Sequence, residues 1–151
     1  MLQSIRQFLA SVSSNPAGDA FSHSDPRWAA AALLFHVIAV DGVVSDSERE
    51  RLRTILASRY ALTPAETTEL MREAEAADLE AVDLYRFTSV IVAAYDQSQR
   101  KEVIAAMWDL AYVDGHMDEF EENVLWRVSE LLGISARDRI ELKRIAERKQ
   151  D

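Results

Sequence analysis

The sequence predicts an all-α protein, and three observations support this fold class. Gly occurs four times and Pro three times among 151 residues, which is too few for the turns of a β-rich fold. No segment alternates apolar and polar residues with the period of two that a half-buried strand needs. Apolar residues instead recur at helical spacing between clear start and stop signals. A chain of this length can bury the core of one domain.

The composition indicates which classes of molecule the protein can bind. The formal net charge of −9 argues against binding to nucleic acid or directly to anionic lipid, because phosphates would be repelled. It is compatible with cations or basic proteins. The absence of Cys excludes disulfides and thiolate metal sites. No apolar run approaches the roughly 20 residues of a membrane span, and the N-terminus does not have the pattern of a secretory signal.

We predict eight helices. The first is a short amphipathic helix within an N-terminal segment of residues 1–24, which either docks on the body of the protein or acts as a weak anchor. The other seven begin at residues that can serve as N-caps. These caps are Asp25, Ser45, Thr63, Asp78, Ser98, Asp118 and Ser135. The predicted helix over 78–94 is apolar on several faces, which indicates a central position.

The main domain, residues 25–151, contains an internal repeat. Residues 25–56 align with 98–129 at a constant offset of 73, without gaps. The identical pairs are Arg27/Arg100, Ala32/Ala105, Val40/Val113, Asp41/Asp114, Gly42/Gly115, Glu48/Glu121 and Leu52/Leu125. A one-residue deletion then aligns the third helices, giving units 25–76 and 98–149 on either side of the 78–94 helix. We expect the units to pack around a pseudo-twofold axis, because neither can bury its apolar faces alone.

Each unit carries the loop signature Asp-Gly-x-φ-x-x-x-Glu, where φ is apolar. The glycines suit a helix C-cap, and Glu48 and Glu121 stand where a capping box places its carboxylate. Asp41 and Asp114 are not explained in this way. A carboxylate at a helix C-terminus faces the negative end of the dipole, which is unfavourable by up to about 1 kcal/mol, and a nearby cation would remove that penalty.

The spacing from Gly to Glu is also that of the second half of an EF-hand loop. The first two EF-hand ligand positions would be Val37 and Ala39 in one unit, which cannot ligate, so a standard EF-hand is rejected. Two half-loops together predict a divalent-ion site for Ca²⁺, Mg²⁺ or Mn²⁺. Its candidate ligands are Asp41, Glu48, Asp114, Glu121 and Asp118. Two separate weak sites and an ion-free acidic interaction surface remain alternatives.

Other reactive residues fit structural roles. His36 lies in an apolar stretch and is expected to be a core or boundary histidine, and Asp109 takes the equivalent place in the second unit. Trp28, Trp108 and Trp126 are expected in the core. No Glu-x-x-His motif and no nucleophile with a base is present, so a metal-dependent hydrolase is the least favoured function.

The tract from Phe35 to Glu48, and its repeat from Trp108 to Glu121, resembles the TerB-like tellurite-resistance family and the related N-terminal region of the DjlA co-chaperone group. The resemblance covers residues 25–148. It implies an all-helical fold with internal twofold pseudosymmetry, and a bacterial cytoplasmic stress-response protein that associates with the membrane through a partner. The family's acidic positions fall on Asp41, Glu48, Asp114 and Glu121. It implies a non-enzymatic module that binds a divalent cation and a protein partner.

Overall fold

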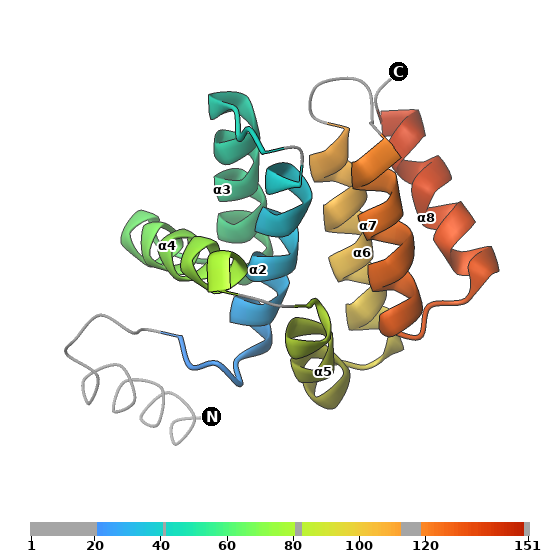
Figure 1. Cartoon of the computed structure of the whole chain (residues 1–151), viewed down its shortest axis with the longest axis horizontal. Helices are drawn as coiled ribbons and strands as arrows, with labels where there is room; N and C mark the ends of the chain where they lie inside the picture. The colour runs from blue at the N-terminus through green and yellow to red at the C-terminus, as the bar shows by residue number, and fades with distance from the viewer. Residues whose placement is uncertain (1–20, 41, 81–82, 113–118, 150–151) are drawn as a thin grey trace.

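The computed structural model describes residues 21–40, 42–80, 83–112 and 119–149, and within them all regular structure is helical (Figure 1). The helices are α2 (Pro26–Ala39), α3 (Asp46–Tyr60), α4 (Pro64–Glu80), α5 (Tyr85–Ala94), α6 (Gln97–Ala111), α7 (Glu119–Leu131) and α8 (Ala136–Lys149). The predicted all-α class is confirmed. The predicted amphipathic helix in residues 1–24 lies almost wholly outside the described residues.

Most helix boundaries follow the predicted caps. The Asp25 side chain accepts a hydrogen bond from the Arg27 N–H, and Pro26 opens α2. Ser45 and Glu48 form the reciprocal capping box at the start of α3, as predicted. At the end of α7, Gly133 has φ +73° and the Ile134 N–H bonds back to the Ser129 carbonyl. A left-handed glycine closes a helix in this way without the steric penalty of a Cβ.

Two of the predicted helix starts are wrong. Asp78 does not cap a helix, because α4 continues through it to Glu80. The reason is tertiary: Ala77 continues the buried face of α4 beyond the predicted end at residue 76, and the Asp78 carboxylate is bound by a side chain of another helix. The single helix predicted over 78–94 is therefore divided between the last turn of α4 and α5. Helix α6 begins two residues early, because Asp96 rather than Ser98 forms its capping box.

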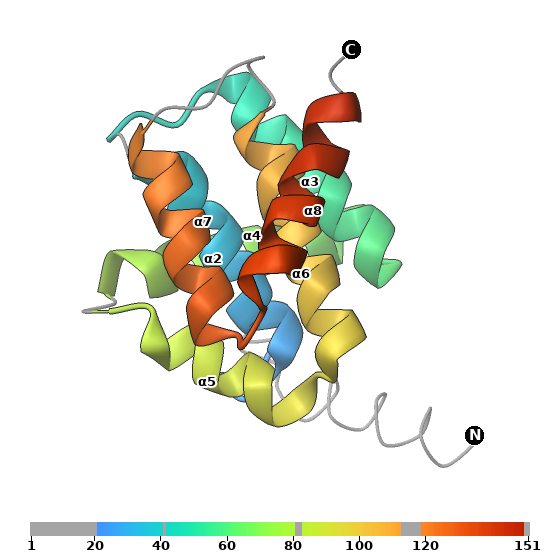
Figure 2. The ribbon, with the colours of Figure 1, turned by 90° about the vertical axis from the view of Figure 1, so that its right-hand side faces the viewer.

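The central helix is α2, not the segment 78–94. Ten of the fourteen residues of α2 are buried, whereas α5 buries only Phe87, Thr88 and Ile91. Helix α2 contacts α3, α4, α5, α6 and α7, and in Figure 2 it lies behind α7 and among these neighbours. The consecutive alanines Ala29–Ala32 are at most 1% exposed. Short side chains on every face let the surrounding helices approach closely.

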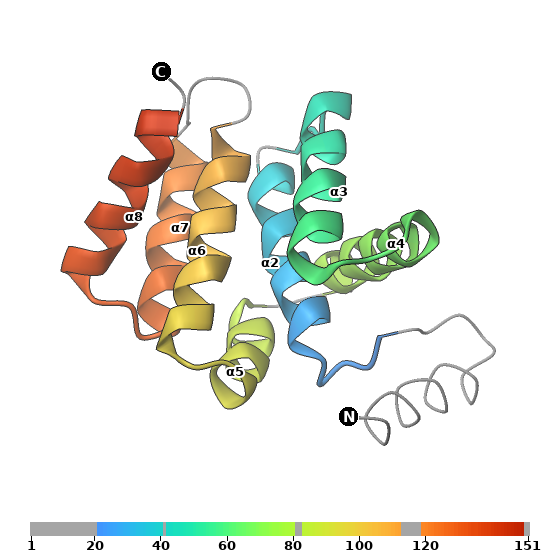
Figure 3. The same cartoon turned by 180° about the vertical axis from the view of Figure 1, so that it is seen from behind.

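Contacts between the two units are reciprocal. Helices α2 and α6 touch each other, α2 touches α7, and α3 touches α6. Exchange of the units converts the second contact into the third, as the predicted pseudo-twofold arrangement requires. The third helices differ: α8 runs alongside α6, whereas α4 lies across α2 and α3 (Figures 1 and 3). The repeat therefore holds best for the first two helices of each unit.

The close packing around α2 gives a stability prediction. Ala31 is fully buried, so Ala31→Leu should overpack the core and lower the free energy of unfolding by about 1–3 kcal/mol. Chemical denaturation measures this value. Ala65→Leu on the exposed side of α4 is the control and should change stability by less than about 0.5 kcal/mol. Equal effects of the two substitutions would contradict the central position of α2.

Candidate functional site

The two acidic loops start from neighbouring helix ends. Helices α2 and α6 pack side by side and end at the same end of the molecule, where α3 and α7 begin (Figures 1 and 3). The two helices that precede the doubled Asp-Gly signature in the sequence therefore end at one end of the molecule rather than at opposite ends. This arrangement is a precondition for a site to which both loops contribute.

The described residues test only part of the predicted ligand set. Asp41, Asp114 and Asp118 lie outside them. Glu48 is 7% exposed, and its Oε1 accepts a hydrogen bond of 2.9 Å from the Ser45 N–H. Glu121 lies half-buried in the first turn of α7. The capping role of Glu48 is confirmed, and a ligand role for either glutamate stays a prediction.

Further acidic residues lie close to Glu48 and Glu121 along the chain. Asp46 lies in the first turn of α3, and Glu119 and Glu122 lie in the first turn of α7. Carboxylates are stabilised there by the positive end of the helix dipole. Lys143 of α8 binds Glu122 at 2.7 Å, so part of this charge is already neutralised. Within the described ranges, no three His, Asp or Glu side chains are grouped closely enough to hold a metal ion.

The repeat-equivalent pair His36 and Asp109 proves to be structural. The His36 Nδ1 lies 2.6 Å from Oδ1 of Asp78 on α4, and Asp109 pairs with the Lys149 Nζ on α8 at 3.4 Å. In each unit a charged or polar pair thus joins the first helix to the third. The acid lies on the third helix in the first unit and on the first helix in the second unit. The prediction of a boundary histidine is confirmed: the His36 side chain is 30% exposed.

The shorter of these pairs should contribute measurably to stability. Asp78 is only 10% exposed, so His36→Ala should lower the free energy of unfolding by about 1–2 kcal/mol, as expected for a hydrogen bond to a charged group. Asp109→Ala should have an effect below about 1 kcal/mol, because Lys149 is mostly exposed. A double-mutant cycle over His36 and Asp78 measures the coupling. A coupling of zero would show that the pair does not tie α4 to α2.

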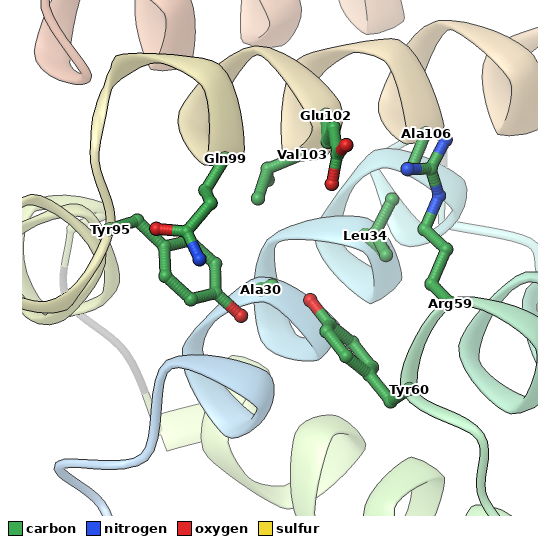
Figure 4. Close-up of a pocket in the computed structure, with 9 residues that line it drawn as sticks. All are labelled: Ala30, Leu34, Arg59, Tyr60, Tyr95, Gln99, Glu102, Val103 and Ala106. Atoms are coloured by element: carbon green, nitrogen blue, oxygen red, sulfur yellow. The ribbon is translucent and has the colours of Figure 1, made fainter.

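A cavity of about 460 Å³ lies at the junction of the two units, and the sequence did not predict it (Figure 4). Its lining residues are Ala30, Leu34, Arg59, Tyr60, Tyr95, Gln99, Glu102, Val103 and Ala106. Arg59 and Tyr60 reach into it from the end of α3, and Gln99 and Glu102 come from α6. The floor consists of the four buried aliphatic residues from α2 and α6.

The cavity contains two tyrosines and two charged groups. The Tyr60 hydroxyl points toward that of Tyr95 across Ala30 (Figure 4). Burial, followed by the neighbouring Tyr95 hydroxyl, raises the pKa of Tyr60 well above its usual value. Neither Arg59 nor Glu102 forms an ion pair with any residue that the structure describes. These are the only two charged side chains in the lining of this cavity.

Tyrosine burial predicts a stability loss at high pH. Burial and a hydrogen bond to Glu147 also raise the pKa of Tyr112, to about 12. The folded chain keeps these protons while the unfolded chain releases them near pH 10. Their contribution is therefore fully present below about pH 10 and is lost as pH rises toward and past the folded values. Melting temperatures between about pH 9 and 12 should fall, and less steeply in Tyr60→Phe. An equal slope in the variant would contradict the assignment to Tyr60.

Comparison with known proteins gives one match. The model of the family described as tellurite resistance protein TerB matches residues 27–144, a range that runs from α2 into α8 and includes both acidic loops. No curated protein and no solved structure matches the chain. None of the helices in the described part of the chain is long and apolar enough to cross a membrane.

Proposed function

The chain belongs to the TerB tellurite-resistance family, and from this premise we propose that it is a non-enzymatic stress-response module. In this proposal a divalent cation, Ca²⁺, Mg²⁺ or Mn²⁺, binds at the paired acidic loops, and the loaded end of the protein contacts a protein partner. The candidate ligands are Asp41 and Glu48 from one loop and Asp114, Asp118 and Glu121 from the other. All five supply oxygen, which these hard cations prefer.

The observation that carries the proposal is that the helices before the two loops end at the same end of the molecule (Figure 1). Helices α2 and α6 contact each other and end at the same end of the molecule, and in the sequence Asp41 and Asp114 follow closely after these ends. Each of these helix ends presents the negative end of its dipole. The positive dipole ends of α3 and α7 lie at the same end of the molecule, so it is the acidic side chains that give this end an excess of negative charge, which a divalent cation would relieve. Half an EF-hand loop offers too few oxygens alone, but two halves offer a fuller set.

Glu48 can serve both roles. Its Oε1 holds the Ser45 N–H at 2.9 Å, and a carboxylate has a second oxygen with lone pairs of its own. The capping box also fixes the side chain in one position, which lowers the entropy lost when an ion binds. A ligand that is already positioned favours binding for the same reason that any preorganised site does.

Thermal denaturation with added cation tests the proposal. At one hundred times its Kd, a bound ion adds about 2.7 kcal/mol to the free energy of unfolding and should raise Tm by several degrees. We expect such a rise with millimolar Ca²⁺, Mg²⁺ or Mn²⁺ in the full chain after treatment with chelator. The Asp41→Asn/Asp114→Asn variant should lose it.

A charge-matched control separates ligation from general repulsion. Glu80→Gln/Glu130→Gln also removes two negative charges, but from the last turns of α4 and α7, away from the loops. This control should keep the rise in Tm. If no cation raises Tm, or if the Asp41/Asp114 variant responds as the original chain does, the cation site is rejected.

Two contacts favour a second candidate, an ion-free interaction module. Glu48 is already satisfied by its capping box, and Lys143 already neutralises Glu122. In that case the acidic end binds a basic partner directly, and salt weakens the complex while chelator leaves it unchanged. Partner capture in the presence of chelator therefore distinguishes the two candidates.

A further inference from the structure

We propose that the cavity between the two repeat units binds a small zwitterion with an aromatic body, of the chemical class of the aromatic amino acids. This site is separate from the acidic loops. It lies between the end of α3 and the first half of α6 (Figure 4), whereas the loops follow the ends of α2 and α6. The proposal therefore does not depend on the cation site.

Two alanines in the lining of the cavity stand where the other unit has larger side chains. Ala30 aligns with Val103, and Ala106 aligns with Leu33. Both alanines line the hollow and are at most 1% exposed. The volume of about 460 Å³ lies within the range of about 300–1,000 Å³ that is typical of small-molecule sites.

The walls suit an aromatic body. The floor is aliphatic and buried, and Tyr60 and Tyr95 approach from opposite sides with their rings at its edge (Figure 4). Aromatic rings favour offset or edge contacts with one another. Two tyrosine hydroxyls and the Gln99 amide supply polar atoms around this apolar surface. A site with an apolar floor and a few convergent polar groups is the usual form of a small-molecule pocket.

The charges select a zwitterion. Arg59 on α3 and Glu102 on α6 both line the cavity and form no ion pair with the described residues. A ligand with a single negative charge would be attracted by Arg59 and repelled by Glu102. A ligand with a single positive charge would be attracted by Glu102 and repelled by Arg59. A carboxylate and an ammonium on one small head group complement both side chains. Charge complementarity of this kind determines which ligand is accepted.

Four probe molecules that carry different combinations of the ring, the carboxylate and the ammonium test this inference. Titration of the full chain, followed by ligand-observed NMR, would use L-phenylalanine, phenethylamine without the carboxylate, 3-phenylpropionate without the ammonium, and L-alanine without the ring. We expect L-phenylalanine to bind tightest. The two single-charge probes should bind several-fold more weakly, and L-alanine should not bind measurably.

Variants locate the binding site and separate its parts. Arg59→Gln should weaken L-phenylalanine about two- to fivefold, the range for partly exposed charge pairs, and should strengthen phenethylamine, because the repulsion between Arg59 and its ammonium is removed. Glu102→Gln should weaken L-phenylalanine similarly and should strengthen 3-phenylpropionate, because the repulsion between Glu102 and its carboxylate is removed. Arg51→Gln on the outer side of α3 and Glu130→Gln on α7 are the matched controls, since both side chains are exposed and lie outside the cavity.

Filling the cavity gives the decisive variant. Ala106→Leu introduces the residue that the first unit carries at this position, and it should abolish binding of L-phenylalanine. If Ala106→Leu unfolds the chain, the Arg59 and Glu102 variants still test the proposal. Absence of binding by every probe, or binding of L-phenylalanine that survives both charge substitutions unchanged, overturns it.

Discussion

Burial of α2 on all sides is the constraint on which the rest of the fold depends. A helix with ten buried residues out of fourteen has no solvent face and must be enclosed by other helices. The first unit provides α3 and α4, and the second provides α6 and α7. Neither unit alone can enclose it. Duplication therefore provides the second half of the enclosure, and this physical need explains why the units share one core.

Residues that are identical in the two units do not all make equivalent contacts. Arg27 folds back onto Asp25 and lies over Phe21, whereas Arg100 donates to the carbonyls of Val92, Tyr95 and Leu132. The second arginine ties the ends of α5 and α7 to α6, and the first stabilises the start of α2. Identity at these aligned positions is thus not accompanied by a common contact. The shared feature is the placement of a long cationic side chain near the start of each unit's first helix.

The two candidate sites follow from different properties of the duplication. At the loop end the units are alike, because the same signature occurs twice and the helices that precede it end together. At the cavity they differ, because Ala30 and Ala106 stand opposite larger counterparts in the alignment. A shared cation site needs the similarity, and a ligand cavity needs the difference. A protein with two similar units can thus have one site where the units are alike and another site where they differ.

The sequence by itself determined the helical class, the repeat and most helix starts, because these depend on local capping and periodicity. It also identified the capping box of Ser45 and Glu48. Tertiary structure decided the rest. The end of α4 depends on burial of Ala77 and on the contact between Asp78 and His36, which lie 42 positions apart. The central role of α2 and the cavity beside it depend on which faces meet, and residue order along one helix does not specify its neighbours in space.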